Sequence, residues 1–113
     1  MFGLKQQYID LIHTVFAQYS EIDQVIVYGS RAKGNYKPGS DIDLTIKGNL
    51  EFGSLMKLEN QLDDLLLPYI IDLSLYHKIN NPDLIDHIGR VGKVFYEKSQ
   101  INYINSNVYL ENI

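Results

Sequence analysis

Residues 25–46 of the chain read VIVYGSRAKGNYKPGSDIDLTI, which is two runs of strand-forming residues separated by a basic, Gly-rich segment. The first run ends at Tyr28 and is followed by Gly29-Ser30. In the second run the side chains alternate between two faces, because a strand has a period of two residues. Asp41 and Asp43 therefore project from one face, with their Cα atoms roughly 6–7 Å apart. Carboxylates this close repel each other unless a cation neutralises them, and Mg²⁺ prefers such oxygen ligands.

The overall composition is that of one ordinary globular domain. The chain has 113 residues, of which 45% are hydrophobic and 21% charged, and its net charge is −4. It has no cysteine, which excludes a disulfide framework and a cysteine-based zinc site. Broad nucleic-acid binding needs a basic surface, so we expect no direct nucleic-acid partner. No signal-peptide pattern or membrane-length apolar run is present, so we expect a cytoplasmic protein without a membrane partner.

Hydrophobic spacing predicts the element order α-β-β-α-β-α. Apolar residues at helical spacing predict amphipathic helices near residues 4–19 and 51–67, and Pro68 is expected to end the second one. Runs rich in strand-forming residues predict three strands, at 25–28, 41–46 and 69–76.

The last part of the chain begins with a helix-start signal. Asn81-Pro82-Asp83 combines a capping residue, a proline at the first helical position and an early acid, and this helix is expected to end near Gly89. Residues 91–96 could form a final extended segment. We therefore predict a single α+β domain over residues 1–98, with a mixed sheet of about three to four strands flanked by helices. Residues 99–113 would be a C-terminal tail that is either flexible or docks on a partner.

The strand predicted at 69–76 contains an acid among apolar residues. Asp72 lies between Ile71 and Leu73, where an unpaired ionised carboxylate is unfavourable. If this strand pairs beside residues 41–46, Asp72 joins Asp41 and Asp43 on one face. Three convergent acids suit one or two divalent ions, and one acid could also take a proton from an attacking hydroxyl. The alternative is that Asp72 caps a strand end or pairs with an arginine.

The Gly-Ser turn is the other half of the predicted site. Gly29 allows the backbone to approach a ligand closely, and the N–H groups and hydroxyl at Ser30 suit a phosphate. Arg31, Lys33 and Lys37 could add positive charge at a triphosphate, although basic residues in loops are commonly just solvated. The segment is not a P-loop, because the Gly-Lys-[Ser/Thr] ending is absent.

Taken together, these motifs resemble a known signature. Gly29-Ser30, ten intervening residues, Asp41-x-Asp43 and an acid on a later strand are similar to the DNA polymerase β-type nucleotidyltransferase superfamily. The string GSRAKGNYKPGSDIDL most resembles its minimal nucleotidyltransferase (MNT) branch, and the resemblance covers roughly residues 25–96. It implies a polymerase β-like palm domain in which the Gly-Ser pair contacts the nucleoside triphosphate. By the same resemblance, Asp41 and Asp43 hold Mg²⁺, and Asp72 is a metal ligand and the base.

Membership of the MNT branch would also imply a partner. Small MNT proteins are commonly encoded with a helical HEPN protein as toxin–antitoxin pairs, and the MNT antitoxin transfers AMP from ATP to a tyrosine of the toxin. The resemblance therefore implies a HEPN-type toxin as partner, ATP as nucleotide donor and Mg²⁺ as cofactor, with one or two ions. An oligomer is compatible with the sequence.

Two other functions stay open at this point. The chain could be a non-catalytic antitoxin that neutralises its partner by binding alone. It could also be a nucleotidyltransferase that acts on RNA or a small molecule, which the acidic charge and the lack of room for an acceptor-binding domain disfavour.

Overall fold

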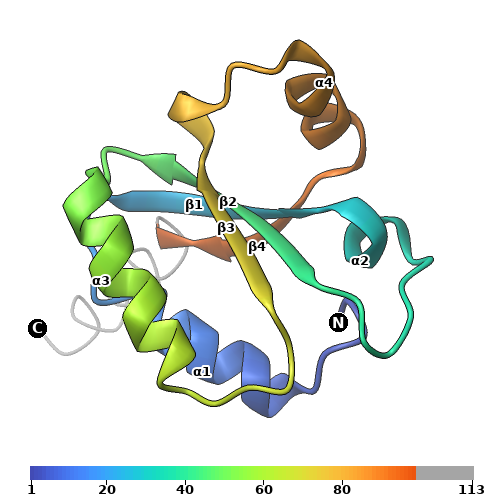
Figure 1. Cartoon of the computed structure of the whole chain (residues 1–113), viewed down its shortest axis with the longest axis horizontal. Coiled ribbons are helices and arrows are strands. Elements are labelled where there is room, and N and C mark those ends of the chain that lie inside the picture. Colours follow the sequence, from blue (N-terminus) through green and yellow to red (C-terminus); the bar gives the residue numbers. More distant parts are fainter. Residues whose placement is uncertain (99–113) are drawn as a thin grey trace, which may run out of the picture.

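The structure, a computed structural model, describes residues 1–98 of the chain. In this part, four α-helices flank a four-stranded sheet (Figure 1). The helices are α1 (Gln6–Phe16), α2 (Gly29–Lys33), α3 (Phe52–Asp63) and α4 (Pro82–Val91). The strands are β1 (Ile22–Tyr28), β2 (Ile42–Gly48), β3 (Ile71–Leu75) and β4 (Lys93–Glu97), and a 3₁₀ turn, Tyr76–Lys78, follows β3. The predicted tail, residues 99–113, lies outside the described residues. Within residues 1–98, no helix combines the length and the apolar character needed to cross a membrane.

The sheet is mixed, with the strand order β3-β2-β1-β4. β1 runs antiparallel to both of its neighbours, whereas β2 and β3 are parallel. Parallel neighbours need a long crossover connection, which α3 supplies. The prediction of an α+β domain with a mixed sheet flanked by helices is therefore confirmed. The extended segment expected over residues 91–96 corresponds to β4, which pairs with β1 at one edge of the sheet.

The predicted end of the second long helix is wrong, because α3 ends at Asp63 rather than at Pro68. After the helix, Leu65 and Leu66 donate their N–H groups to carbonyls three residues earlier, which tightens the last turn. Leu66 then adopts a φ of +53°, which a right-handed helix cannot contain. The chain has thus already left the helix before it reaches the proline.

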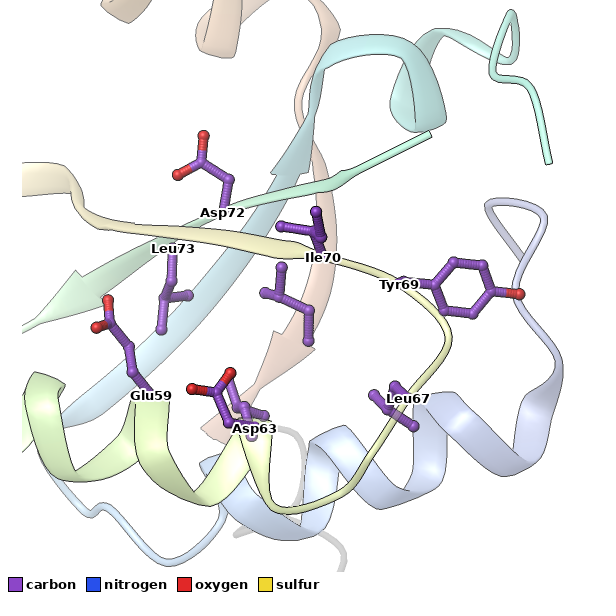
Figure 2. Close-up of a pocket in the computed structure, with 9 residues that line it drawn as sticks. Glu59, Asp63, Leu67, Tyr69, Ile70, Asp72 and Leu73 are labelled. Carbon is purple, nitrogen blue, oxygen red and sulfur yellow. The ribbon is translucent and has the colours of Figure 1, made fainter. Parts of the chain in front are cut away.

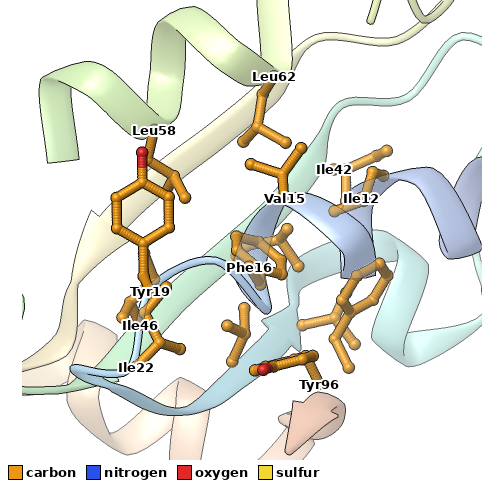
Figure 3. Close-up of a cluster of buried hydrophobic side chains, with 14 of the residues drawn as sticks. Ile12, Val15, Phe16, Tyr19, Ile22, Ile42, Ile46, Leu58, Leu62 and Tyr96 are labelled. Atoms are coloured by element: carbon orange, nitrogen blue, oxygen red, sulfur yellow. The ribbon is translucent and has the colours of Figure 1, made fainter. Parts of the chain in front are cut away.

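The main hydrophobic core lies between the sheet and the two helices α1 and α3 (Figure 3). Most of the predicted amphipathic faces of these helices are confirmed, since Ile12, Phe16, Leu58 and Leu62 are buried, but Leu11 and Leu66, at the same helical spacing, are exposed. The strands contribute the alternate positions that face these helices, which are Val25, Val27, Leu44 and Ile46. Full burial of such a side chain stabilises the folded state by about 1.5–3 kcal/mol, so the residues on this face of the sheet stabilise the fold.

The helix α4 lies on the other side of the sheet from α1 and α3 (Figure 1). It begins as predicted, because the side chain of Asn81 accepts hydrogen bonds from the N–H groups of Asp83 and Leu84. A second, smaller apolar cluster joins Ile26 and Tyr28 of β1 to Ile88 of α4. Because α4 packs on β1 and α2, the same face stays accessible over part of β2 and β3, where Asp72 is exposed and Asp43 is only partly buried.

Candidate active site

Two of the three predicted acids are direct neighbours in the sheet. In the parallel pairing of β2 with β3, Asp43 lies opposite Asp72. Residues paired in this way point to the same face, and neighbouring strands are about 4.8 Å apart. The carboxylates therefore project side by side from the face that α4 only partly covers, while Leu44 and Leu73 point to the opposite face. The expectation that the strand containing Asp72 pairs beside residues 41–46 is met by this register.

The third predicted acid, Asp41, lies just before β2 and is exposed. Burial raises the pKa of Asp43, the negative charges of Asp72 and Asp41 raise it further, and His87 lowers it. The pKa of Tyr28, which lies opposite Asp43 on β1, is also raised, chiefly by burial. A hydrogen bond with Ser74 opposes that shift, and the charges of Asp72 and Asp43 add to it. The site is thus a patch of unneutralised negative charge.

The donor set suits a hard cation. Carboxylate oxygens are the ligands that Mg²⁺ prefers. The ion pair found within residues 1–98 joins Arg90 to Asp86 on α4, so it does not neutralise the acids of the site. In the described part of the chain, the side chains as placed form no close-set group of three or more His, Cys, Asp or Glu residues. The fit to a metal therefore rests on the adjacent pair, Asp43 and Asp72, with Asp41 close enough to affect the pKa of Asp43.

The Gly-Ser turn lies directly against Asp43 of the acid pair. Gly29 opens α2 with a φ of +72°, a conformation that side-chain-bearing residues rarely adopt. A β-carbon at this position would also overlap the Oδ2 atom of Asp43. Ser30 follows in the first turn of α2 and is half-buried. The predicted phosphate-binding turn and the predicted metal-binding strand are therefore brought together, and only glycine fits at their junction.

The structure gives Arg31 a different role from the one expected. Its guanidinium group is buried and donates to the carbonyl oxygen of Ser40 from Nε and Nη2, at 3.1 and 2.8 Å, and to that of Phe2 from Nη1, at 3.0 Å. It also lies over the rings of Tyr36 and Tyr69. These contacts close the long loop between α2 and β2, so Arg31 is a structural residue and is not proposed as a phosphate ligand. Lys33, by contrast, is exposed at the end of α2.

Sequence reasoning gave no role to His87, yet the structure places it at the turn. Its Nε2 atom accepts a hydrogen bond of 3.2 Å from the Gly29 N–H, and its ring contacts Tyr28 edge to face. The available signal was its position three residues after Leu84 and just before Ile88, on the buried side of α4. That spacing predicts a residue facing the sheet, but it cannot identify which backbone group the side chain meets.

A cavity of about 350 Å³ lies between α3 and β3, and Asp72 is one of the residues that line it. Figure 2 shows that Leu73 points to the same side of the sheet as the α3 residues Glu59 and Asp63. The carboxylate of Asp72 points away from them, to the opposite side (Figure 2). The cavity is therefore bounded by the backbone of the acidic strand rather than by its reactive groups.

The sheet, the acid pair and the Gly-Ser turn lie in one small α+β domain, and its class is shown by its sequence family. The sequence profile described as "Polymerase beta, Nucleotidyltransferase" matches residues 10–101, and the chain belongs to this family. A search of curated protein sequences finds no match.

Several solved structures share the fold. A chain in a toxin–antitoxin crystal structure with AMP-PNP is 18% identical, with a TM-score of 0.63, over 96% of this chain and 91% of that chain. A Shewanella oneidensis complex of a tri-AMPylated HEPN toxin with an MNT antitoxin matches with 16% identity and a TM-score of 0.61, over 96% and 91% of the two chains. A putative nucleotidyltransferase from Sulfolobus solfataricus matches with 17% identity and a TM-score of 0.51, over 83% and 80%. At such identities the similarity shows a common fold.

Proposed function

We propose that the chain is a Mg²⁺-dependent nucleotidyltransferase that transfers AMP from ATP to a tyrosine hydroxyl of a HEPN-type toxin, and so acts as an antitoxin. The observation that carries this proposal is the register of β2 and β3, which sets Asp43 beside Asp72 on an open face of the sheet. Family membership supports nucleotidyl transfer. The structural neighbours, one with AMP-PNP and one with a tri-AMPylated HEPN toxin, support the choice of nucleotide and acceptor.

The proposed roles follow from the position of each residue. Ser30, with its hydroxyl and its N–H at the start of α2, would hold the phosphates beside Gly29, and Lys33 would add positive charge from the exposed end of α2. Asp41, Asp43 and Asp72 would hold Mg²⁺, which when bound offsets the charge of the phosphates and of the leaving pyrophosphate.

The transfer step needs one proton acceptor. In the proposed reaction, the acceptor oxygen forms a bond to the α-phosphorus as the bond from that phosphorus to pyrophosphate breaks. The hydroxyl proton passes to Asp72, which is exposed on β3 and so can meet a group supplied by another molecule. Asp43 is partly buried and held against Gly29, so it is better suited to a fixed ligand role than to meeting the acceptor.

The open face of β2 and β3 supports a protein acceptor. The tyrosine of another protein must reach the acids from outside the domain. The helix α4 packs over the neighbouring strand β1 and leaves the side chain of Asp72 exposed to such an acceptor. The acidic net charge of −4 does not favour RNA as the acceptor.

Incubation of the purified chain with its genome-neighbouring helical partner, Mg²⁺ and α-labelled ATP tests the proposal. We expect label on a tyrosine of the partner, located by mass spectrometry, and loss of labelling in Asp72→Asn. Asp63→Asn, which removes the same charge from the far side of the sheet, should label normally. An unlabelled partner, or normal labelling by Asp72→Asn, would overturn the proposal.

A second experiment separates catalysis from neutralisation by binding. The double variant Asp41→Asn/Asp43→Asn should still bind the partner but should no longer neutralise it. Full neutralisation by this variant would instead establish the non-catalytic antitoxin.

A further inference from the structure

Within residues 1–98, one hydrogen bond ties the helix α4 to the Gly-Ser turn. The Gly29 N–H donates to His87 Nε2 at 3.2 Å, across a sequence separation of 58 residues. A backbone amide can only donate, so Nε2 is the acceptor of this hydrogen bond. The contact therefore fixes the position of the His87 ring relative to the turn.

The ring of His87 is itself held in place by packing. It meets the Tyr28 ring edge to face, with the ring centroids 6.1 Å apart and an interplanar angle of 81°. The next residue, Ile88, is 5% exposed and packs with Ile26 and Tyr28 in the smaller core cluster. The acceptor atom thus stands on a rigid, capped helix rather than on a mobile loop.

The donor side of this contact is conformationally soft. Gly29 has a φ of +72°, and without a β-carbon its peptide groups can rotate at little cost. The same residue separates β1 from Ser30, so a rotation there moves the hydroxyl and the N–H of Ser30 relative to Asp43. A fixed acceptor for the Gly29 N–H is what would hold this turn in one conformation.

We propose that His87 is a positioning residue of the nucleotide site: it holds the Gly29–Ser30 turn in the conformation that binds phosphate. This inference rests on the proposed nucleotide-binding function and deepens it. It also reassigns one group, because the Gly29 N–H is already bonded to His87 and is not itself a phosphate ligand. Phosphate recognition at the turn then falls to Ser30.

Three variants of the full chain test the proposal. His87→Phe keeps a ring against Tyr28 but removes the acceptor, and His87→Gln places an amide oxygen near the position of Nε2. Gly89→Ala is the matched control on α4, because a β-carbon there meets no atom within 4 Å. Calorimetric titration with Mg·AMP-PNP should show binding about fivefold weaker or worse for His87→Phe, near wild-type for His87→Gln, and unchanged for Gly89→Ala.

A second measurement does not depend on nucleotide. Amide hydrogen exchange followed by NMR should show Gly29 protected in the wild-type chain, exchanging about tenfold faster in His87→Phe, and protected again in His87→Gln. In transfer assays with the partner, His87→Phe should raise the KM for ATP more than it lowers kcat.

The possible outcomes separate the inference from the function it rests on. If the wild-type chain does not bind Mg·AMP-PNP, the proposed function fails. If it binds and His87→Phe binds equally well, the positioning role is wrong. If His87→Phe binds more tightly, His87 blocks the Gly29 N–H rather than supporting the turn, which also overturns the proposal. Fast exchange of Gly29 in the wild-type chain would overturn it whatever the nucleotide does.

Discussion

Substitution of Asp43 by asparagine should abolish nucleotidyl transfer and yet make the nucleotide-free protein more stable. Asp43 lies opposite Asp72 in the sheet, and its pKa is raised by burial and by the charges of Asp72 and Asp41. The raised pKa means that the folded chain disfavours the ionised carboxylate. Asparagine has nearly the same shape without the charge, so it removes this penalty.

The size of the effect can be worked from the register. Two unit charges about 5 Å apart in water interact by about 1 kcal/mol, and the dielectric constant of water applies because Asp72 is exposed and Asp43 is only partly buried. In a domain of this size, 1 kcal/mol corresponds to a Tm higher by about 4 °C. Added salt should reduce the difference, since it screens exposed charges.

The sign of the pH dependence follows from the direction of the shift. The penalty on Asp43 is fully present above its raised folded-state pKa. The penalty is lost as the pH falls through the folded-state pKa towards 3.8, which is the ordinary pKa of an aspartate and applies in the unfolded chain. The stability advantage of Asp43→Asn should therefore be present at neutral pH and disappear in acid.

Thermal unfolding followed by circular dichroism, with and without Mg·AMP-PNP, provides the assay. Asp23→Asn is the control, because it removes the same charge from an exposed position at the other end of β1. Mg·AMP-PNP should raise the Tm of the wild-type chain and of the control, but not of Asp43→Asn. A Tm for Asp43→Asn equal to or below that of wild type at neutral pH and low salt would refute the electrostatic reasoning.

Other substitutions separate the site from its scaffold. Gly29→Ala should lower stability by about 2 kcal/mol, because φ is positive and the methyl group overlaps Asp43, and should abolish binding of Mg·AMP-PNP; Gly39→Ala, in open space, should change neither. Arg31→Gln should lower stability by about 3 kcal/mol in denaturant unfolding, since it breaks charged hydrogen bonds to carbonyls, but should leave nucleotide affinity within twofold. Leu58→Ala should cost about 2–5 kcal/mol in the same assay, because its side chain is fully buried; a smaller loss would contradict the core described for α3.

The parts of the fold that could be predicted were those set by local periodicity. Alternation along residues 41–46 and the isolated acid at Asp72 were enough to predict a shared acidic face, because a strand has only two faces. The helical spacing of the residues that form α1 and α3 likewise identified their buried sides. The end of α3 was missed because Pro68 is a clear helix breaker, whereas the positive φ of Leu66 leaves no comparable mark in the sequence.

The roles of Arg31 and His87 could not be predicted, because both depend on contacts far along the chain. A basic residue beside a Gly-Ser turn looks like a phosphate ligand until the carbonyls of Phe2 and Ser40 are known to receive its hydrogen bonds. His87 meets Gly29 only because α4 docks over β1. In both cases the missing information was which backbone groups lie within reach, and this is decided by tertiary packing.

The parallel pairing of β2 with β3 also determines when the site comes into being during folding. The segment from β1 through α2 to β2 is contiguous, so Gly29, Ser30 and Asp43 can come together through local contacts. Asp72 can join them only after the chain has passed through α3 and closed a long loop, and such pairings are slow to form. A nascent chain that ends before β3 therefore contains the residues of the turn but lacks Asp72. A reaction that requires Asp72 can therefore take place only after β3 has paired with β2.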